Sequence, residues 1–259
     1  TLAARLPSTL RMGTSSWNFP GWPLWQGRYR EELLSQKGLS AYAQHPLLKT
    51  VGLDRSHYRP MTLSELREMK QGLPEDFRFM VKAHEHCTLA RFPDHARYGT
   101  QRGCPNSRYL DPIYAKEVVV GPVSEGLGKN LGILLFQFAP QDEQEMGAPH
   151  FADRLWDFLS LLPKGIPYAV ELRNPRLYSP ALADVLLASR TIPGLSVWSG
   201  LPSLADQARR LQIHRHSTRL IRWMLRPNDR YEDAFRRMQP FERLSEPDSD
   251  QRAAIAALI

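Results

Sequence analysis

The stretch GILLFQF, from Gly132 to Phe138, is an apolar run of strand length interrupted only by Gln137. A continuous run of this kind is typical of a strand that is buried on both faces, as in a parallel sheet. Comparable runs recur and indicate seven strands, at Leu10–Ser15, Leu48–Leu53, Phe77–Ala83, Gly132–Phe138, Tyr168–Leu172, Leu195–Trp198 and Leu220–Leu225. Segments with helical spacing lie between them, at Tyr29–Ala43, Thr62–Gly72, Pro112–Leu127, Phe151–Leu162 and Pro180–Ser189.

Alternation of strands and helices along the whole chain predicts a parallel sheet with helical crossovers. Seven such units in 259 residues favour a closed barrel over an open sheet. We therefore expect an α/β fold, a TIM-barrel-like closed parallel β/α barrel, built as one domain over residues 1–259. The segment 84–111 is polar, rich in Arg and His and without a clear period, and we expect an inserted loop over the barrel mouth there.

The composition is that of a folded, basic chain, with 34 Lys and Arg against 27 Asp and Glu and a net charge of +7. This excess favours polyanionic partners only weakly. No apolar run approaches the length of a membrane-spanning helix, so we expect no membrane partner. Cys87 and Cys104 form no CxxC pair and are expected to be free thiols in a reducing cytosol. The first residues, from Thr1 onward, lack the apolar core of a secretory signal, which makes cytoplasmic the expected location.

Residue alternation along each predicted strand identifies the side chains that share the barrel interior. Val170 and Leu172 are apolar and are expected to face the helices, which points Glu171 and Arg173 inward. By the same argument the inward set at the C-terminal end of the barrel also includes Asp54, Lys82, Gln137 and Arg222. On the run from Gly132 to Phe138, Leu135 shares the inward side with Gln137, and the outward side holds Leu134, Phe136 and Phe138. Active sites of β/α barrels lie at that end, so this convergence of polar side chains is the predicted site.

Each of these residues has two interpretations. Glu171 and Arg173 either form an ion pair that fills the barrel interior or take part in function, because buried charge is costly unless it is paired. Lys82 either pairs with Glu171 or Asp54 or acts as a base with a lowered pKa. Gln137 needs a hydrogen-bond partner from the protein or from a ligand.

The alternating segment HEH, from His84 to His86, would place two imidazoles on one side of a strand, as metal ligands can be. There is no HExxH helix and no obvious third ligand, so metal binding is the less favoured interpretation and no metal ligand is assigned. The sequence also contains no G-x-G-x-x-G, Walker or G-x-S-x-G motif. The cofactor is therefore unknown.

Two further segments leave alternatives open. MGTSSWNFPGWPLW, from Met12 to Trp25, is either a stacking platform for a base or sugar or a hydrophobic plug over the barrel mouth. The stretch Arg209–Arg237 holds nine arginines against three acids. It is either a solvated helical face or a phosphate-binding rim.

Five segments resemble, in order and spacing, motifs of the YecE-like family, a group of bacterial proteins classed as a domain of unknown function. GTSSWNFPGW, from Gly13 to Trp22, is similar to the family's Gly-Thr-Ser-Gly-Trp-Ser-Tyr-Pro-x-Trp signature. The other four are TVGLDRSHYRP (Thr50 to Pro60), FRFMVKA (Phe77 to Ala83), LGILLFQFAP (Leu131 to Pro140) and YAVELRNP (Tyr168 to Pro175). The resemblance spans about Arg11 to Arg226 and implies a TIM-barrel-like fold.

The resemblance implies little about activity, because the family is not biochemically defined. A likeness to metal-dependent DNA-repair endonucleases has been suggested for it on structural grounds. The chain departs from the family's pattern at Gly52 in place of Glu, Asp54 in place of Asn, His57 in place of Phe and Asn174 in place of His. The loss of that Glu and that His disfavours a metal site. The sequence ends at Ile259, before the family's Asn-Asn-containing final strand, so we expect a barrel that is seven-stranded or incompletely closed at its C-terminal end.

Three hypotheses for function follow. The favoured one is an enzyme, or a degenerate enzyme, that binds a small anionic or sugar-like ligand in the barrel mouth. In it, Lys82 and Glu171 are the catalytic acid–base pair. The predicted ligand-binding residues, most of them implied by the resemblance, are Thr14, Ser15, Trp17, Asp54, Tyr58, Gln137, Arg173 and Arg222. The alternatives are a nucleic-acid-binding protein or nuclease that uses Arg209–Arg237 and the tryptophan loop, and a scaffold whose aromatic loop binds another protein.

Overall fold

A computed structural model describes residues 2–19, 22, 31–227, 229–239, 241, 243 and 246–259. Seven strands form one sheet in which every strand is hydrogen-bonded in parallel to its neighbours in the sequence. They are β1 (Met12–Thr14), β2 (Leu48–Leu53), β3 (Arg78–Lys82), β4 (Leu131–Phe138), β5 (Tyr168–Leu172), β6 (Ile192–Val197) and β7 (Leu220–Trp223).

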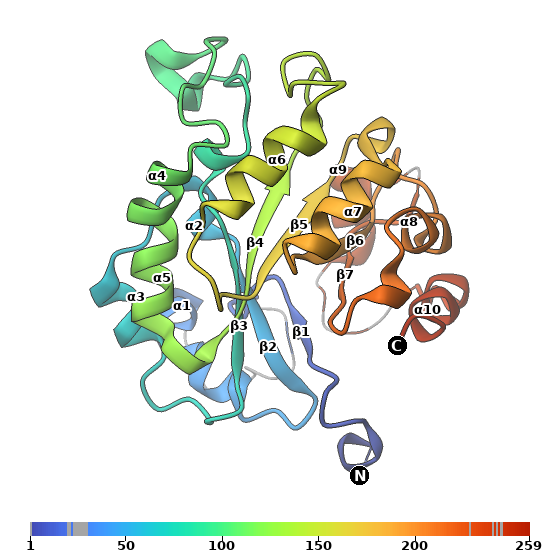
Figure 1. The fold of residues 1–259 in the computed structure, drawn as a ribbon. Helices are drawn as coiled ribbons and strands as arrows, with labels where there is room; N and C mark the ends of the chain where they lie inside the picture. The colour runs from blue at the N-terminus through green and yellow to red at the C-terminus, as the bar shows by residue number, and fades with distance from the viewer. Residues whose placement is uncertain are drawn as a thin grey trace.

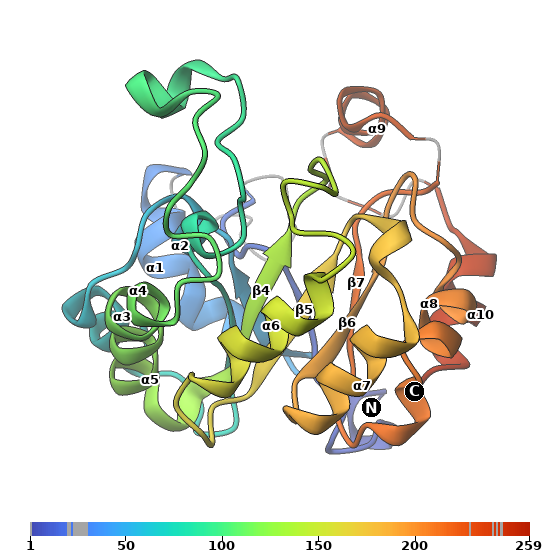
Figure 2. The ribbon, with the colours of Figure 1, turned by 45° about the horizontal axis from the view of Figure 1, so that its top comes forward.

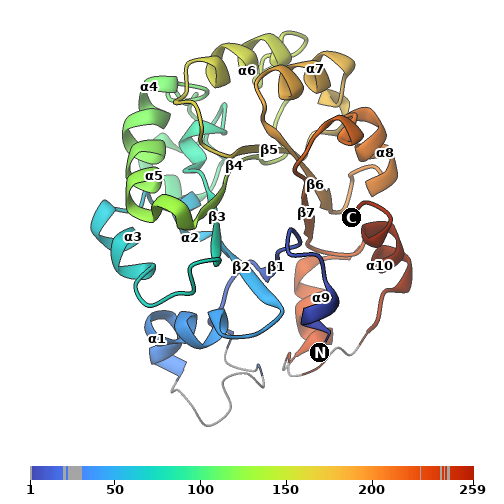
Figure 3. The ribbon, with the colours of Figure 1, turned by 60° about the horizontal axis from the view of Figure 1, so that its bottom comes forward.

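The sheet curls into an incompletely closed barrel. Figure 3 shows the strands as an arc with β1 and β7 at its two ends and the helices around the outside. Among the described residues no ladder joins β7 to β1. This confirms the predicted TIM-barrel-like α/β fold in its seven-stranded, incompletely closed form.

Helices connect successive strands and cover much of the outer face of the sheet, and the last two helices follow β7 (Figure 1). They are α1 (Glu31–Ala43), α2 (Arg55–Tyr58), α3 (Leu63–Met69), α4 (Pro112–Tyr114), α5 (Gly121–Leu127), α6 (Phe151–Ser160), α7 (Pro180–Ala188), α8 (Leu204–Arg210), α9 (Tyr231–Met238) and α10 (Ser249–Ala256). A π-helical segment, Ala115–Val120, joins α4 to α5, so the predicted helix at 112–127 is present as one run.

Local sequence signals start several of these helices. Thr62 begins α3 with a capping box, in which its hydroxyl accepts from the Glu65 backbone N–H and the Glu65 carboxylate accepts from the Thr62 N–H. Ser179 caps α7 and Pro180 occupies the first helical position. The sequence analysis did not predict α2, α8, α9 or α10, because they are short and carry few apolar residues. The first two residues of the helix predicted at 29–43 lie outside the described part of the chain.

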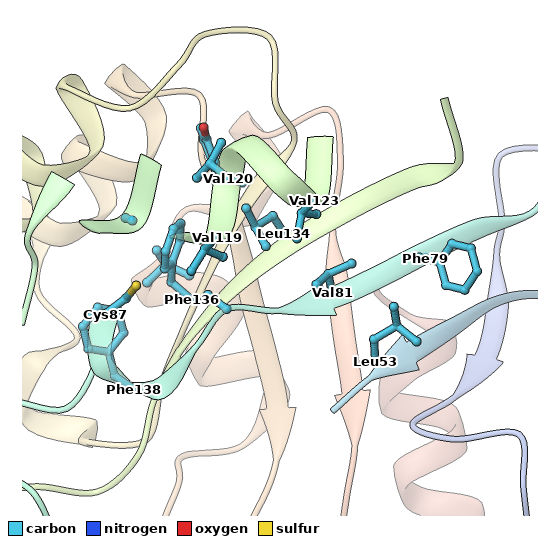
Figure 4. Packing of buried hydrophobic residues seen from close by; sticks show 14 of the residues in the cluster. Leu53, Phe79, Val81, Cys87, Val119, Val120, Val123, Leu134, Phe136 and Phe138 are labelled. Atoms are coloured by element: carbon cyan, nitrogen blue, oxygen red, sulfur yellow. The ribbon is translucent and has the colours of Figure 1, made fainter. Parts of the chain in front are cut away.

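Strand alternation divides the core into two layers. On β4, Leu134, Phe136 and Phe138 point outward into the large cluster between sheet and helices (Figure 4). Leu135 of the same strand points into the barrel, where it packs with Met80. That inner cluster consists of Met80, Leu135, Ala169 and Ile192 with Ile133 and Leu220. The inward and outward sides predicted for β4 are therefore correct.

The segment 84–111 follows β3 and rises beyond the C-terminal ends of the strands, above α4 (Figure 2). It is ordered by its own contacts, with a small apolar cluster of Leu89, Phe92 and Tyr98. The Asn106 side chain donates to the carbonyl oxygens of His86 and Leu89, at 2.8 and 2.7 Å. The aperiodic sequence thus folds around polar backbone contacts rather than around regular elements.

Within the described ranges, none of the helices has the length and apolar character needed to cross a membrane.

Candidate functional site

The inner face of the barrel changes from apolar to charged toward the C-terminal ends of the strands. Two residues beyond Met80, Leu135, Ala169 and Leu220 of the inner cluster stand Lys82, Gln137, Glu171 and Arg222, respectively. Because residues two apart on a strand share a face, this polar set lies directly above the apolar layer. All four side chains are buried. We call Asp54, Lys82, Gln137, Glu171, Arg173 and Arg222 the mouth cluster.

Glu171 is the centre of the mouth cluster. It is fully buried, and its Oε1 accepts from Arg173 Nε at 3.1 Å while its Oε2 accepts from Arg222 Nη1 at 2.9 Å. Gln137 Oε1 accepts from the same two guanidinium groups, at 3.3 Å from Arg173 and 3.2 Å from Arg222. The Arg173 guanidinium also lies over the Trp198 ring, 4.1 Å from its centroid. Both arginines are therefore held in fixed positions.

A glycine on β6 leaves space for the contact between Glu171 on β5 and Arg222 on β7. The strand between them, β6, carries Gly194 directly beside Glu171 in the sheet register. A Cβ at position 194 would lie 3.1 Å from the Cβ of Glu171, closer than side chains normally pack. The absence of a side chain there leaves room for the ion pair to span β6.

Lys82 lies at the C-terminal end of β3 with 8% of its surface exposed. Its Nζ makes no hydrogen bond or close ion pair with a described residue. Burial lowers the Lys82 pKa to about 8, with Asp54 opposing that shift and the positive charges of Arg222 and Arg173 adding to it. Lys82 is thus a cation whose N–H donors have no described partner, and it loses its proton more readily than an ordinary lysine.

Asp54 and Arg222 face each other across the mouth cluster without making a hydrogen bond. Asp54 Oδ1 and Arg222 Nη2 are 3.9 Å apart, and both are buried atoms with no hydrogen-bond partner in the described structure. Buried polar atoms normally have a partner. Lys82, whose charge interacts with those of Asp54 and Arg222, adds further donors to this part of the mouth cluster.

The charges of the mouth cluster do not balance. Lys82, Arg173 and Arg222 are set against Glu171 and Asp54, which leaves one positive charge when Lys82 is protonated. An anion is the ligand that such a buried surplus favours.

A second polar group lies near Lys82 and is formed by residues of the inserted segment together with His57. The Glu85 carboxylate accepts from Arg97 Nη2 at 2.6 Å and from the Tyr98 hydroxyl at 3.1 Å, and burial raises the Glu85 pKa. His57 Nδ1 donates to the Ala83 carbonyl oxygen at 3.1 Å. Burial and the nearby Lys82 charge lower the His57 pKa to about 3, so this imidazole is neutral at physiological pH.

Sequence analysis did not assign His57, Glu85 or Arg97 to a site. His57 stands in the TVGLDRSHYRP segment and was noticed only as a departure from the family's pattern. Arg97 comes from the aperiodic loop, where strand alternation gives no guidance. Their grouping depends on how the loop folds back onto the end of β3.

Four predicted ligand-binding residues lie apart from the buried ion pairs. The Thr14 hydroxyl is within hydrogen-bond distance of the Tyr42 hydroxyl (2.8 Å) and donates to the Ser16 carbonyl (2.6 Å). Trp17 is buried and its Nε1 donates to the Leu34 carbonyl of α1 at 3.2 Å. Both side chains therefore bind α1, outside the barrel. The other two are Ser15, which is exposed beside Gly52, and Tyr58, which is exposed with the Arg97 guanidinium 4.8 Å from its ring centroid.

The aromatic loop packs against the protein in its described part. Trp22 is partly buried and stacks with Tyr42, with ring centroids 6.4 Å apart. Trp25 lies outside the described residues. The packing of Trp17 and Trp22 is that of a hydrophobic anchor for α1.

The two imidazoles of the HEH segment contact each other and neighbouring side chains of the protein. His84 Nδ1 lies 2.7 Å from the Tyr114 hydroxyl, and the His84 and His86 rings are 4.3 Å apart. Burial lowers the His84 pKa to about 4. In the part of the chain that the structure describes, no three His, Cys, Asp or Glu side chains are grouped to hold a metal ion.

The arginine-rich stretch is largely engaged in ion pairs. Five of its nine arginines pair with acids in the described structure, at positions 209, 222, 226, 236 and 237. Arg226 and Arg237 both bind Glu246, at 2.9 Å each. This stretch therefore presents less positive charge than its composition indicates.

The fold and site define a TIM-barrel-like α/β protein with an incompletely closed ring and a buried charge cluster at the C-terminal ends of its strands. The chain belongs to the family described as protein of unknown function DUF72, which matches residues 11–254. This is the YecE-like family, so the resemblance identified in the sequence is confirmed.

Solved structures of the same family are similar to this chain. Two crystal structures of a DUF72 family protein from Enterococcus faecalis V583 share 16% identity, cover 80% and 91% of this chain and 94% and 96% of theirs, and give TM-scores of 0.44 and 0.47. A DUF72 family protein from Thermotoga maritima MSB8 shares 16% identity, with coverage of 82% and 90% and a TM-score of 0.49. No curated protein matches the sequence.

Proposed function

We propose that the mouth cluster binds a small organic anion that also carries a hydroxyl group, and that the protein is an enzyme acting on such a compound. The observation that carries this proposal is the set of unused polar atoms beside Lys82. Lys82 Nζ and Arg222 Nη2 are donors without a described partner, and Asp54 Oδ1 is an acceptor without one.

The geometry supports separate contacts for the two polar groups of the ligand. A carboxylate or phosphate takes the donors of Lys82 and Arg222, because charge-assisted hydrogen bonds to such groups are the strongest that a buried cation makes. A hydroxyl of the same molecule donates to Asp54. Arg173 and Glu171 do not contact the ligand in this arrangement, since each is already hydrogen-bonded within the protein, and they fix the position of Arg222.

Lys82 is the proton carrier in this proposal. A lysine with a pKa of about 8 is neutral in a useful fraction of molecules near neutral pH, as a general base must be. Glu171 was predicted from the sequence as its acid–base partner. Both Glu171 oxygens accept from arginines, and Asp54, which has a free oxygen, is the better placed carboxylate to exchange a proton with Lys82 or with the ligand.

The experiment is a calorimetric titration with inorganic phosphate, glycerol 3-phosphate and glycerol. We expect glycerol 3-phosphate to bind most tightly, phosphate more weakly and glycerol not at all. Lys82→Met removes one charge-assisted contact and should weaken phosphate binding about 10-fold or more. Lys129→Met, at an exposed lysine paired with Glu75, is the matched control and should leave binding unchanged. Equal affinity of the wild type and the Lys82→Met variant would refute the proposed site.

Nucleic acid is not the ligand that these contacts favour. The phosphate-binding rim, one of the two interpretations of Arg209–Arg237, is partly neutralised by neighbouring acids, and Trp17 and Trp22 pack against α1 instead of forming an open stacking surface. A calorimetric titration with duplex DNA at two salt concentrations tests this directly, because phosphate contacts lose affinity steeply with salt. We expect no salt-dependent binding that responds to Lys82→Met.

A further inference from the structure

We propose that Lys82 forms a covalent imine with its ligand, so that the substrate class is an aldehyde or ketone carrying a carboxylate or phosphate. This inference rests on the proposed anion-binding function of the mouth cluster and adds the reacting group of the ligand. It is carried by the position of Lys82, a buried amine above an apolar layer and beside two arginines, with no described hydrogen-bond acceptor at its Nζ.

An amine that attacks a carbonyl carbon must first be neutral, and the surroundings of Lys82 favour the neutral form. The residue two positions before it on β3, Met80, belongs to the apolar inner cluster with Leu135 and Ala169. Arg222 and Arg173 repel a further positive charge nearby. A lysine used only as a structural cation would instead be held by a carboxylate, as Arg222 is held by Glu171.

The neighbouring groups supply what imine formation requires. Arg222 Nη2 is a fixed donor that binds the anionic end of the ligand and so holds its carbonyl group near Lys82 Nζ. Asp54 is the carboxylate that most strongly favours the ammonium form of Lys82 among its charged neighbours, and it has a free oxygen. Asp54 is therefore the group that accepts the proton released when Lys82 becomes a nucleophile.

The step balances without any external oxidant or reductant. Asp54 takes the ammonium proton of Lys82, and the freed nitrogen lone pair forms a bond to the carbonyl carbon while the C=O π pair moves to oxygen, which takes that proton from Asp54. The nitrogen then gives a second proton to the regenerated Asp54 carboxylate, which leaves a neutral carbinolamine. Asp54 passes this second proton to the hydroxyl group, which leaves as water while the nitrogen lone pair closes the C=N bond. The product is a protonated imine, whose positive charge replaces that of the original ammonium and remains balanced by Asp54 and Glu171.

Reductive trapping tests the inference. The full chain is incubated near pH 7.5 with pyruvate, glyoxylate or dihydroxyacetone phosphate and cyanoborohydride, and the modified lysines are located by peptide mass spectrometry. At that pH the neutral fraction of Lys82 exceeds that of an ordinary lysine by on the order of 100-fold. We therefore expect Lys82 to be modified well before the exposed Lys37, Lys129 and Lys164.

A matched variant separates imine formation from anion binding. Lys82→Arg keeps the positive charge and should still bind inorganic phosphate, but it has no amine that can form an imine and should give no adduct at position 82. Inorganic phosphate should slow the trapping of wild-type Lys82 by competing for the anion site. Lactate, which matches pyruvate in size and charge but has no carbonyl, should bind without any adduct. If Lys82→Arg does not fold, the phosphate and lactate measurements on the wild type make the same separation.

The outcomes distinguish the two proposals. Phosphate binding without an adduct on Lys82 from any of the three carbonyl compounds overturns the imine and leaves the anion site standing. Adducts spread evenly over Lys82 and the exposed lysines also overturn it, because they report only general amine reactivity. Absence of both phosphate binding and adducts overturns both proposals. Selective, phosphate-sensitive modification of Lys82 supports both.

Discussion

Arginines occur in two very different settings in this protein, the buried mouth cluster and the exposed part of the stretch Arg209–Arg237, a stretch from which only Arg222 belongs to the mouth cluster. Arg173 and Arg222 share one fully buried carboxylate and one amide oxygen, and Arg222 still has a free buried donor. Arg209 and Arg236 pair with acids three residues away on their own helices, with side chains 71% and 75% exposed.

The comparison teaches that the density of positive charge along the sequence is a poor guide to where an anion will bind. In the exposed stretch, arginines such as Arg209 and Arg236 pair with an acid and lie near water, so their charge is neutralised or screened. In the mouth cluster three cations share two carboxylates in a region with little solvent, and the surplus charge cannot be screened. Burial makes the smaller group of charges the stronger candidate for ligand binding.

The largest effect is expected from Glu171→Gln. Loss of the carboxylate leaves Arg173 and Arg222 buried without a compensating charge, and breaking a buried pair in this way costs about 3–5 kcal/mol of unfolding free energy. Urea unfolding of the wild type and the variant measures this. Glu125→Gln breaks the exposed pair with Arg67 and is the control, with an expected cost of about 0–1 kcal/mol. Equal costs for the two variants would contradict the distinction between buried and exposed arginines.

Lys82→Met should change the free energy of unfolding by an intermediate amount and in the opposite direction, toward greater stability. The folded-state pKa of Lys82, about 8, lies below the ordinary value of 10.5, so folding penalises the charged form. That penalty is full below pH 8 and disappears as pH rises toward 10.5, because the unfolded chain then loses its extra proton. Lys82→Met should therefore be more stable than the wild type by about 2–3 kcal/mol at pH 7, and this advantage should shrink by pH 10.

Urea unfolding at pH 7 and pH 10 checks this prediction. Because the other titratable groups are common to both proteins, their pH dependence cancels in the difference. A stability difference that is the same at both pH values would mean that packing of the methionine, and not the charge of Lys82, causes it.

The smallest effect is expected from Arg236→Ala, which removes the exposed pair with Asp233. Its cost should be about 0.5 kcal/mol or less and should fall further at high salt. A double-mutant cycle with Asp233→Ala isolates the pair from the change in helix propensity. A coupling energy between Arg236 and Asp233 as large as the cost of Glu171→Gln would show that exposed and buried arginine pairs contribute equally to stability.

Much of the fold follows from sequence patterns. The run at 132–138 corresponds to β4 almost residue for residue, and its alternation correctly assigned Leu135 and Gln137 to the interior. The start of β6 was missed because Ile192 is followed by Pro193 and Gly194, residues that usually mark the end of a strand. Helices α9 and α10 were missed because they bury little apolar surface of their own.

The candidate site was only partly predictable. Alternation identified which side chains point inward, but it does not determine which of them meet. The pairing of Glu171 with Arg222 depends on the curvature of the sheet and on the missing side chain at Gly194. Thr14 was assigned to the site by resemblance, whereas its hydroxyl is engaged with Tyr42, a residue of a helix whose packing the strand pattern does not specify.

The strand order has a consequence for the kinetics of folding. Each strand pairs with its neighbour in the sequence, so the sheet grows by successive units with short chain closures. The mouth cluster instead joins residues 51 and 85 positions apart, and it can form only after β4, β5 and β7 are aligned. Contacts that form after the transition state slow unfolding without speeding folding. The stability lost by Glu171→Gln should therefore appear as faster unfolding, with the refolding rate nearly unchanged. The mouth cluster thus stabilises the barrel by slowing its unfolding.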